Sequence, residues 1–157
     1  MGASVPILYI HPAKQGVDLY DRVDHDKMGR PYGLIPMGVP ALVNLLRDDG
    51  YDVRGLDFPM EKRLKPDFNL RQWLLSFDEV RLILIDLHWY EHSYGAISMA
   101  EVCKATLPDA KIILGGLTSS AFAREIIETF PAVDYIIRGD AEQPLLRLVR
   151  RLMPLAP

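Results

Sequence analysis

Five short apolar runs divide the chain, and segments with helical spacing lie between them. Four runs, at residues 7–10, 80–85, 111–114 and 135–137, are continuously apolar, which is typical of strands buried on both faces of a parallel sheet. A weaker fifth run, at residues 52–57, follows Gly50, which stands where a helix C-cap glycine belongs. The pattern therefore predicts five strands.

The segments between these runs have the apolar spacing of helices that bury one face. They are residues 39–49, 70–77, 97–105, 122–130 and 145–152. Strand and helix alternate, and right-handed crossovers are strongly preferred. The pattern therefore predicts an α/β fold with a doubly wound, five-stranded parallel sheet in the order 2-1-3-4-5, which is flavodoxin-like or Rossmann-like.

Length and composition fit one such domain. The chain has 157 residues, 49% of them hydrophobic, a formal net charge of −3 and a single cysteine, Cys103. The absence of a basic stripe argues against nucleic acid as a partner, and one cysteine excludes both an internal disulfide and a four-cysteine zinc site. Without a charged leader or a membrane-spanning stretch, we expect a cytoplasmic domain over residues 1–153, followed by the start of a linker at 154–157.

Ligands of open parallel sheets lie outside the carboxyl ends of the strands, so the loops there are the candidate site. Gly115 and Gly116 follow the fourth strand, where the lack of side chains lets a ligand approach the backbone. We expect Thr118, Ser119 or Ser120 to cap the next helix. The alternative is a tight turn with an ordinary cap and no ligand.

Two other loops carry signals. After the fifth strand, Asp140 is followed three residues later by Gln143, which predicts a capping-box start for the last helix. The long irregular stretch at residues 12–40 is unusual inside a compact domain, and it is too apolar for a free tail. It is predicted to cover a ligand.

The loop after the third strand has the densest chemistry, with three acidic or imidazole side chains after Asp86. His88, Glu91 and His92 match the H-x-x-E-H signature of zinc hydrolases. Asp86 resembles the phosphate-accepting aspartate of response-regulator receivers, but the supporting acidic pair and lysine are replaced by His11-Pro12 and Arg138-Gly139. Two further interpretations stay open: a floor of aromatic and imidazole groups under a planar ligand, and loop histidines without a ligand.

Three motifs resemble those of the N-terminal cobalamin-binding domain that precedes radical S-adenosylmethionine (SAM) domains. They are the loop at residues 36–42, the fourth strand with its turn at 111–118, and the fifth strand with its turn at 133–142. The last turn, Gly139-Asp140-Ala141-Glu142, is similar to the Gly-Glu-Gly-Glu turn of that family. Asp140 stands in place of a glutamate and Ala141 in place of a glycine, so an acidic residue and a small residue are kept. The resemblance covers nearly the whole chain.

This resemblance implies a cobalamin whose corrin ring lies over the strand ends and whose nucleotide tail runs near Gly115 and Gly116. The implied cofactor contacts come from four loops: Gly33, Leu34, Ile35, Pro36, Met37, Gly38, Leu87, His88, Trp89, Tyr90, Gly115, Gly116, Leu117, Thr118, Gly139, Asp140 and Glu142. Many cobalamin proteins ligate cobalt through an Asp-x-His-x-x-Gly loop, which this chain lacks. His88 is the side chain expected nearest the ring.

The resemblance also implies a larger enzyme. In such enzymes three closely spaced cysteines hold a [4Fe-4S] cluster that acts with SAM, and Cys103 alone cannot provide that set. The implied partner is a C-terminal radical SAM domain of the same polypeptide, to which this domain would present a methyl or related group. The alternatives are a cofactor-free signalling domain of the same fold and a metal-dependent hydrolase at His88, Glu91 and His92.

Overall fold

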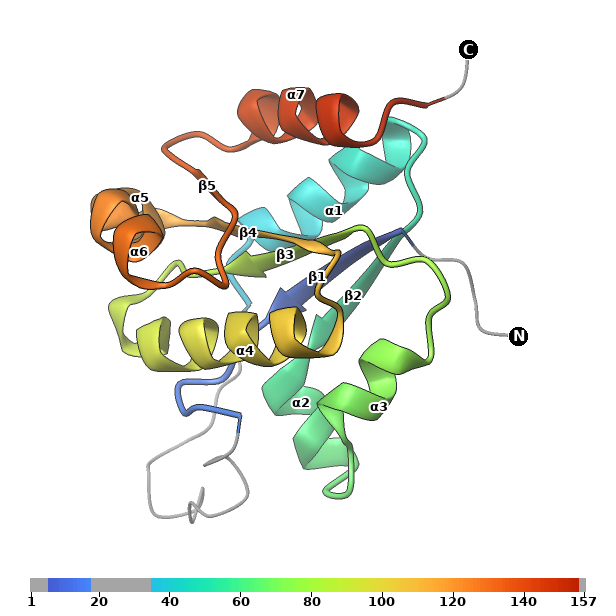
Figure 1. Ribbon diagram of the computed structural model, residues 1–157, viewed down its shortest axis with the longest axis vertical. Coiled ribbons are helices and arrows are strands. Elements are labelled where there is room, and N and C mark those ends of the chain that lie inside the picture. Colours follow the sequence, from blue (N-terminus) through green and yellow to red (C-terminus); the bar gives the residue numbers. More distant parts are fainter. Residues whose placement is uncertain (1–5, 18–34, 156–157) are drawn as a thin grey trace.

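A five-stranded parallel sheet forms the centre of the computed structural model, which describes residues 6–17 and 35–155. Its strands are β1 (Ile7–His11), β2 (Val53–Asp57), β3 (Leu82–Asp86), β4 (Lys111–Gly115) and β5 (Tyr135–Ile137). The order is β2-β1-β3-β4-β5, and all four neighbouring pairs are parallel (Figure 1). The predicted fold class and strand order are confirmed.

Helices cover both faces of the sheet. Along the chain they are α1 (Gly38–Asp48), α2 (Phe58–Leu64), α3 (Leu70–Leu75), the 3-10 turn η2 (Tyr90–His92), α4 (Ser93–Thr106), α5 (Leu117–Ala121), α6 (Ala123–Thr129) and α7 (Glu142–Leu152). Figure 1 shows α1 and α7 on one face and α2, α3 and α4 on the other. No helix in the described ranges is long and apolar enough to span a membrane.

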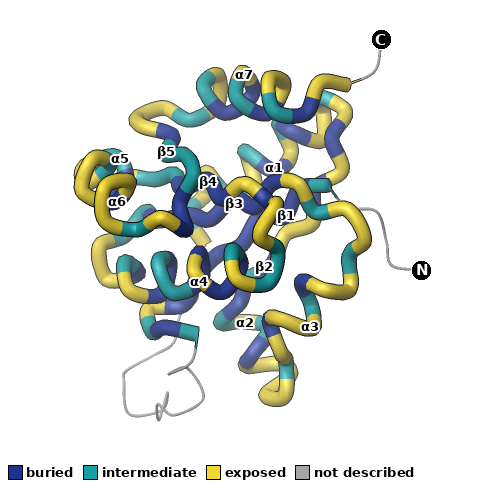
Figure 2. The backbone as a smooth tube through the Cα atoms, viewed as in Figure 1, coloured by how far each residue is buried: buried dark blue, intermediate teal, exposed yellow. Residues whose placement is uncertain are grey.

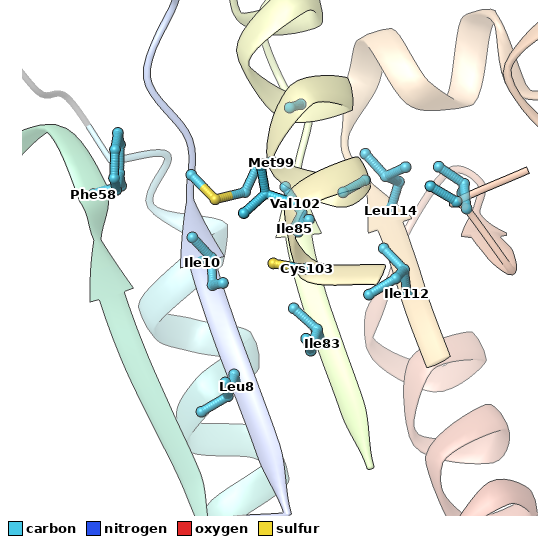
Figure 3. Packing of buried hydrophobic residues seen from close by; sticks show 14 of the residues in the cluster. Leu8, Ile10, Phe58, Ile83, Ile85, Met99, Val102, Cys103, Ile112 and Leu114 are labelled. Atoms are coloured by element: carbon cyan, nitrogen blue, oxygen red, sulfur yellow. The ribbon is translucent and has the colours of Figure 1, made fainter. Parts of the chain in front are cut away.

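The strands are apolar on both sides because each face of the sheet has its own core. Figure 3 shows one of them, where Ile10 and Ile85 of the sheet pack with Met99 of α4. On the opposite face, Tyr9 and Leu84 pack with residues of α1 and α7. Figure 2 shows the strands buried, with the exposed residues on the outer sides of the helices and in the connecting loops.

Several helix boundaries differ from the sequence prediction. The predicted helix at 122–130 corresponds to α6, whereas the short helix α5 before it was not predicted, and the helix predicted at 97–105 begins four residues earlier, at Ser93. Helix α2 was not predicted, although Asp57 caps it by accepting a hydrogen bond from the Met60 backbone N–H at 3.0 Å. The C-cap expectation is confirmed, since Gly50 ends α1 with a φ of +94°.

Candidate functional site

The carboxyl ends of the strands meet at one edge of the sheet, and the candidate residues gather there. The register pairs Asp86 of β3 with Gly115 of β4, and Gly115 with Ile137 of β5. In the loops just beyond, the Leu87 backbone N–H donates to the Gly115 carbonyl at 2.7 Å. The loops after β3, β4 and β5 therefore form one continuous rim.

The two glycines after β4 have different surroundings. Gly116 has a φ of +115°, and a Cβ there would lie 2.7 Å from the backbone carbonyl of Leu87 and 2.8 Å from the His88 nitrogen. Only glycine fits this approach of two loops. A Cβ at Gly115 would meet nothing closer than the Cβ of Ile137, at 4.0 Å. Free space for a ligand beside the backbone therefore lies at Gly115, whereas the space at Gly116 is taken by the neighbouring loop.

The hydroxyl groups after the glycines do not cap a helix, so that prediction is wrong. Gly116 is the N-cap of α5, and no side chain bonds to its first turn. Instead, the Thr118 hydroxyl donates to the His88 carbonyl at 3.0 Å, and the Ser120 hydroxyl donates to the Gly116 carbonyl at 2.8 Å. Ser120 also accepts the Gly139 backbone N–H at 3.0 Å. These hydroxyls connect the three loops of the rim.

The capping box expected at Asp140 is also absent. Helix α7 starts after Ala141, whose side chain has no oxygen, and no side-chain cap bond forms. Asp140 and Glu142 are exposed, and Gly139 has a φ of +69° with open space where a Cβ would be. These acidic groups are therefore not engaged in capping.

A buried imidazole cluster lies at the ends of β1 and β3. The His11 Nδ1 donates to both carboxylate oxygens of Asp86, at 2.9 and 3.0 Å. The ring of His92 meets that of His11 edge-on at 5.3 Å, and the Trp89 ring meets His92 at 5.5 Å. His11, Asp86 and His92 are 2%, 3% and 7% exposed. The sequence analysis did not identify the pair of His11 and Asp86, although adjacent strands end there.

The cluster has one unsatisfied polar atom. The Nδ1 of His92 is buried without a hydrogen-bond partner among the described residues. Burial, and then the nearby His11, lower the pKa of His92, and the Asp86 charge opposes them only in part. His92 is therefore neutral at pH 7. Burial, with a contribution from Asp86, also raises the pKa of Tyr9, so its phenol stays protonated.

The zinc-hydrolase alternative fails on this geometry. His92 points into the buried cluster, whereas Glu91 lies at the surface and pairs with Lys14 at 2.5 Å. The His88 ring packs edge-on against Trp89 at 5.1 Å. Within residues 6–17 and 35–155, no three His, Cys, Asp or Glu side chains are grouped to hold a metal ion.

Apolar side chains are exposed around the same rim. Tyr90 is 75% and Leu117 66% exposed, and the Tyr90 ring lies 6.4 Å from that of Phe122. Met37, at the start of α1, is also exposed, whereas Leu87 is buried in the core. Gly33 and Leu34, which were expected to contact the cofactor, lie outside the described residues. The exposed apolar side chains at the strand ends are available to contact a ligand.

The fold is that of a doubly wound α/β domain, a class in which ligands bind outside the carboxyl ends of the strands. A family model identifies the family within this class. The model of the B12 binding domain matches residues 30–149, and the chain belongs to this family. This confirms the resemblance to cobalamin-binding domains.

Two curated relatives and one solved structure are similar to the chain. The hopanoid C-3 methylase of Methylococcus capsulatus is 23% identical over 76% of this chain and 22% of its own length. The anaerobic magnesium-protoporphyrin IX monomethyl ester cyclase of Cereibacter sphaeroides is 33% identical over 36% of this chain and 9% of its own length. The chain thus matches only a small part of either relative.

The solved structure is the response regulator protein TrrA of Thermotoga maritima. It has 16% sequence identity and a TM-score of 0.55, over 95% of this chain and 99% of that one. This similarity supports the fold alone. The receiver chemistry does not follow from it, since both oxygens of Asp86 are bonded to His11 and the carboxylate is buried.

Proposed function

We propose that this domain binds cobalamin at the carboxyl rim of its sheet and presents a cobalt-bound methyl or related group to a catalytic domain. The observation that carries the proposal is the family match over residues 30–149. The rim offers what a broad macrocycle needs, namely exposed apolar groups at Met37, Tyr90 and Leu117 and an open approach to the backbone at Gly115.

Different parts of the rim would hold different parts of the cofactor. Tyr90, Trp89 and the loop before α1, including Ile35, Pro36, Met37 and Gly38, would contact the corrin ring. The nucleotide tail would follow Gly115 down the sheet, beside Thr118 and Gly139. When bound, cobalamin supplies a cobalt ion that carries and transfers an alkyl group. The side chains of this domain would bind and orient it at the rim.

The catalytic partner in this proposal is a radical SAM domain of the same polypeptide, in the cytoplasm. It would hold the [4Fe-4S] cluster and SAM, because this chain has a single cysteine, which is fully buried. The two curated relatives are a methylase and a cyclase, and this chain matches only 22% and 9% of their lengths. Both facts support a binding module within a larger enzyme.

The test is retention of hydroxocobalamin. After incubation with the cofactor and desalting, the wild-type chain should keep a stoichiometric amount with an altered visible spectrum. Gly115→Val should lose most of it, because the valine side chain fills the free space beside the backbone. Gly55→Val is the matched control, since Gly55 lies in β2 with open space where a Cβ would be. An unchanged spectrum and no retained cofactor in the wild type would support a cofactor-free signalling domain instead.

A further inference from the structure

We propose that His11 is the protein ligand to cobalt, coordinating it through Nε2 on the face of the ring that lies against the sheet. This assignment rests on the proposed cobalamin function. It differs from the sequence expectation, which favoured His88, and it uses no Asp-x-His-x-x-Gly loop. Three observations support it: the position of His11, its hydrogen bond to a carboxylate, and the His92 ring that covers it.

His11 occupies the point where a ligand of this fold sits. It is the last residue of β1, the strand between β2 and β3 in the sheet. The chain winds outward in both directions from β1 and β3, and the crevice between their carboxyl ends is the binding position in doubly wound sheets. Asp86, the last residue of β3, lies on the other side of that crevice.

The hydrogen bond to Asp86 gives His11 the arrangement of a metal-ligating histidine. Such histidines almost always donate one ring N–H to a carboxylate or carbonyl, which fixes the tautomer and raises the basicity of the other nitrogen. The Nδ1 of His11 donates to Asp86 at 2.9 Å. In the neutral ring, Nε2 therefore carries the lone pair that a metal ion needs.

The imidazole ring of His92 covers His11. His92 of η2 lies edge-on against the His11 ring, and its buried Nδ1 has no hydrogen-bond partner within the described ranges. A buried polar nitrogen without a partner is unfavourable, so turning His92 outward would regain a hydrogen bond to water. We expect a ring arriving at the rim to displace the His92 side chain, because His92 belongs to the three-residue turn η2 outside the sheet.

His88 lacks these features. Its ring is partly exposed and packs on Trp89, and no carboxylate in the described part of the chain bonds to it. Its backbone carbonyl is held by the Thr118 hydroxyl, so the loop at this position is fixed to α5. A free imidazole on a fixed surface loop is a weaker candidate than one oriented by a carboxylate.

Electron paramagnetic resonance of bound cob(II)alamin tests the assignment. The wild-type chain is loaded with hydroxocobalamin, reduced with dithionite and desalted without oxygen, once with ordinary histidine and once with histidine carrying the heavy nitrogen isotope. A single axial nitrogen of the natural isotope splits each cobalt line into a triplet, and the heavy isotope gives a doublet. We expect the triplet in ordinary protein and the doublet in labelled protein.

Variants identify the histidine. His11→Ala should retain cobalamin but lose the nitrogen splitting, whereas His88→Ala should keep it. If His11→Ala does not fold, the comparison of labelled with ordinary wild-type protein still shows whether a histidine is the ligand. A triplet that is the same in labelled and ordinary protein comes from the cofactor's own base and overturns the assignment. Loss of the splitting in His88→Ala alone also overturns it. Wild-type protein that retains no cobalamin refutes the proposed function instead.

Discussion

Replacing Gly116 with alanine should destabilise the domain strongly, because two independent terms oppose the new methyl group. Its φ of +115° is a conformation that L residues rarely adopt, which costs about 1–3 kcal/mol. The Cβ would also lie 2.7 Å from backbone atoms of Leu87, which cannot rotate away, and such overpacking costs about 1–3 kcal/mol. We expect a loss of about 2–6 kcal/mol, a large part of the roughly 5–15 kcal/mol that stabilises a typical domain.

Urea unfolding followed by circular dichroism measures this loss. With a slope of about 1–3 kcal/mol per M urea, the midpoint of Gly116→Ala should fall by at least about 0.7 M. The adjacent Gly115→Ala is the matched control. Its Cβ would reach only the Cβ of Ile137, at 4.0 Å, so its free energy of unfolding should stay within about 0.5 kcal/mol of wild type. Equal midpoints for the two variants would refute the argument that the approach of the β3 and β4 loops requires Gly116.

Three further predictions concern single side chains. Asp134→Asn should lower the free energy of unfolding at pH 7 by about 1–3 kcal/mol, measured in urea, because the partly buried Lys104 loses a charged partner at 2.7 Å. Burial opposes ionisation of Asp134, but hydrogen bonds from Lys104 and the Ile112 N–H outweigh it and lower the pKa of this carboxyl. The stabilisation is therefore present above about pH 4, the ordinary range of an aspartate pKa. The difference in free energy of unfolding between wild type and variant should shrink as the pH falls below that value. Burial raises the pKa of Cys103 to about 12, so the native thiol should resist Ellman's reagent at pH 8 and react only on unfolding; fast native labelling would contradict its place in the core. Ser120→Ala should lower the free energy of unfolding by about 1 kcal/mol, because the Gly139 N–H and the Gly116 carbonyl lose the hydroxyl that joins them. Urea unfolding measures this loss, and an unchanged urea midpoint would show that the hydroxyl contributes nothing to stability.

The strands were predictable because burial on both faces leaves an unbroken apolar run, which few other environments demand. Helix α2 gave no such signal, since its buried residues are Phe58 and Lys62 and the rest of the segment is mostly charged. Its start was marked only by Asp57 and the proline that follows Phe58. Local start signals of this kind carry little weight without an apolar stripe.

The start of α4 was missed for a different reason. Gly95 is a poor helix former, and the predicted helix began after it, at residue 97. In the structure Gly95 lies inside the helix, where a Cβ would clash with the backbone carbonyl of Ala13. The glycine is required by packing between α4 and the segment after β1. That contact joins residues far apart in the sequence, and local propensity contains no information about it.

The pair of His11 and Asp86 illustrates how topology decides chemistry at this site. The two residues are 75 positions apart, and the sequence analysis considered Asp86 as a possible phosphate acceptor without pairing it with His11. Parallel pairing of β1 with β3 brings the two strand ends together, and each side chain then determines what the other can do. Under His11, Asp86 is buried and cannot accept a phosphoryl group, although the fold is that of a response regulator. Bonded to Asp86, His11 becomes an oriented imidazole at the position where this fold binds its ligands. The residue at the end of β1 therefore determines what the carboxylate at the end of β3 can do on this scaffold.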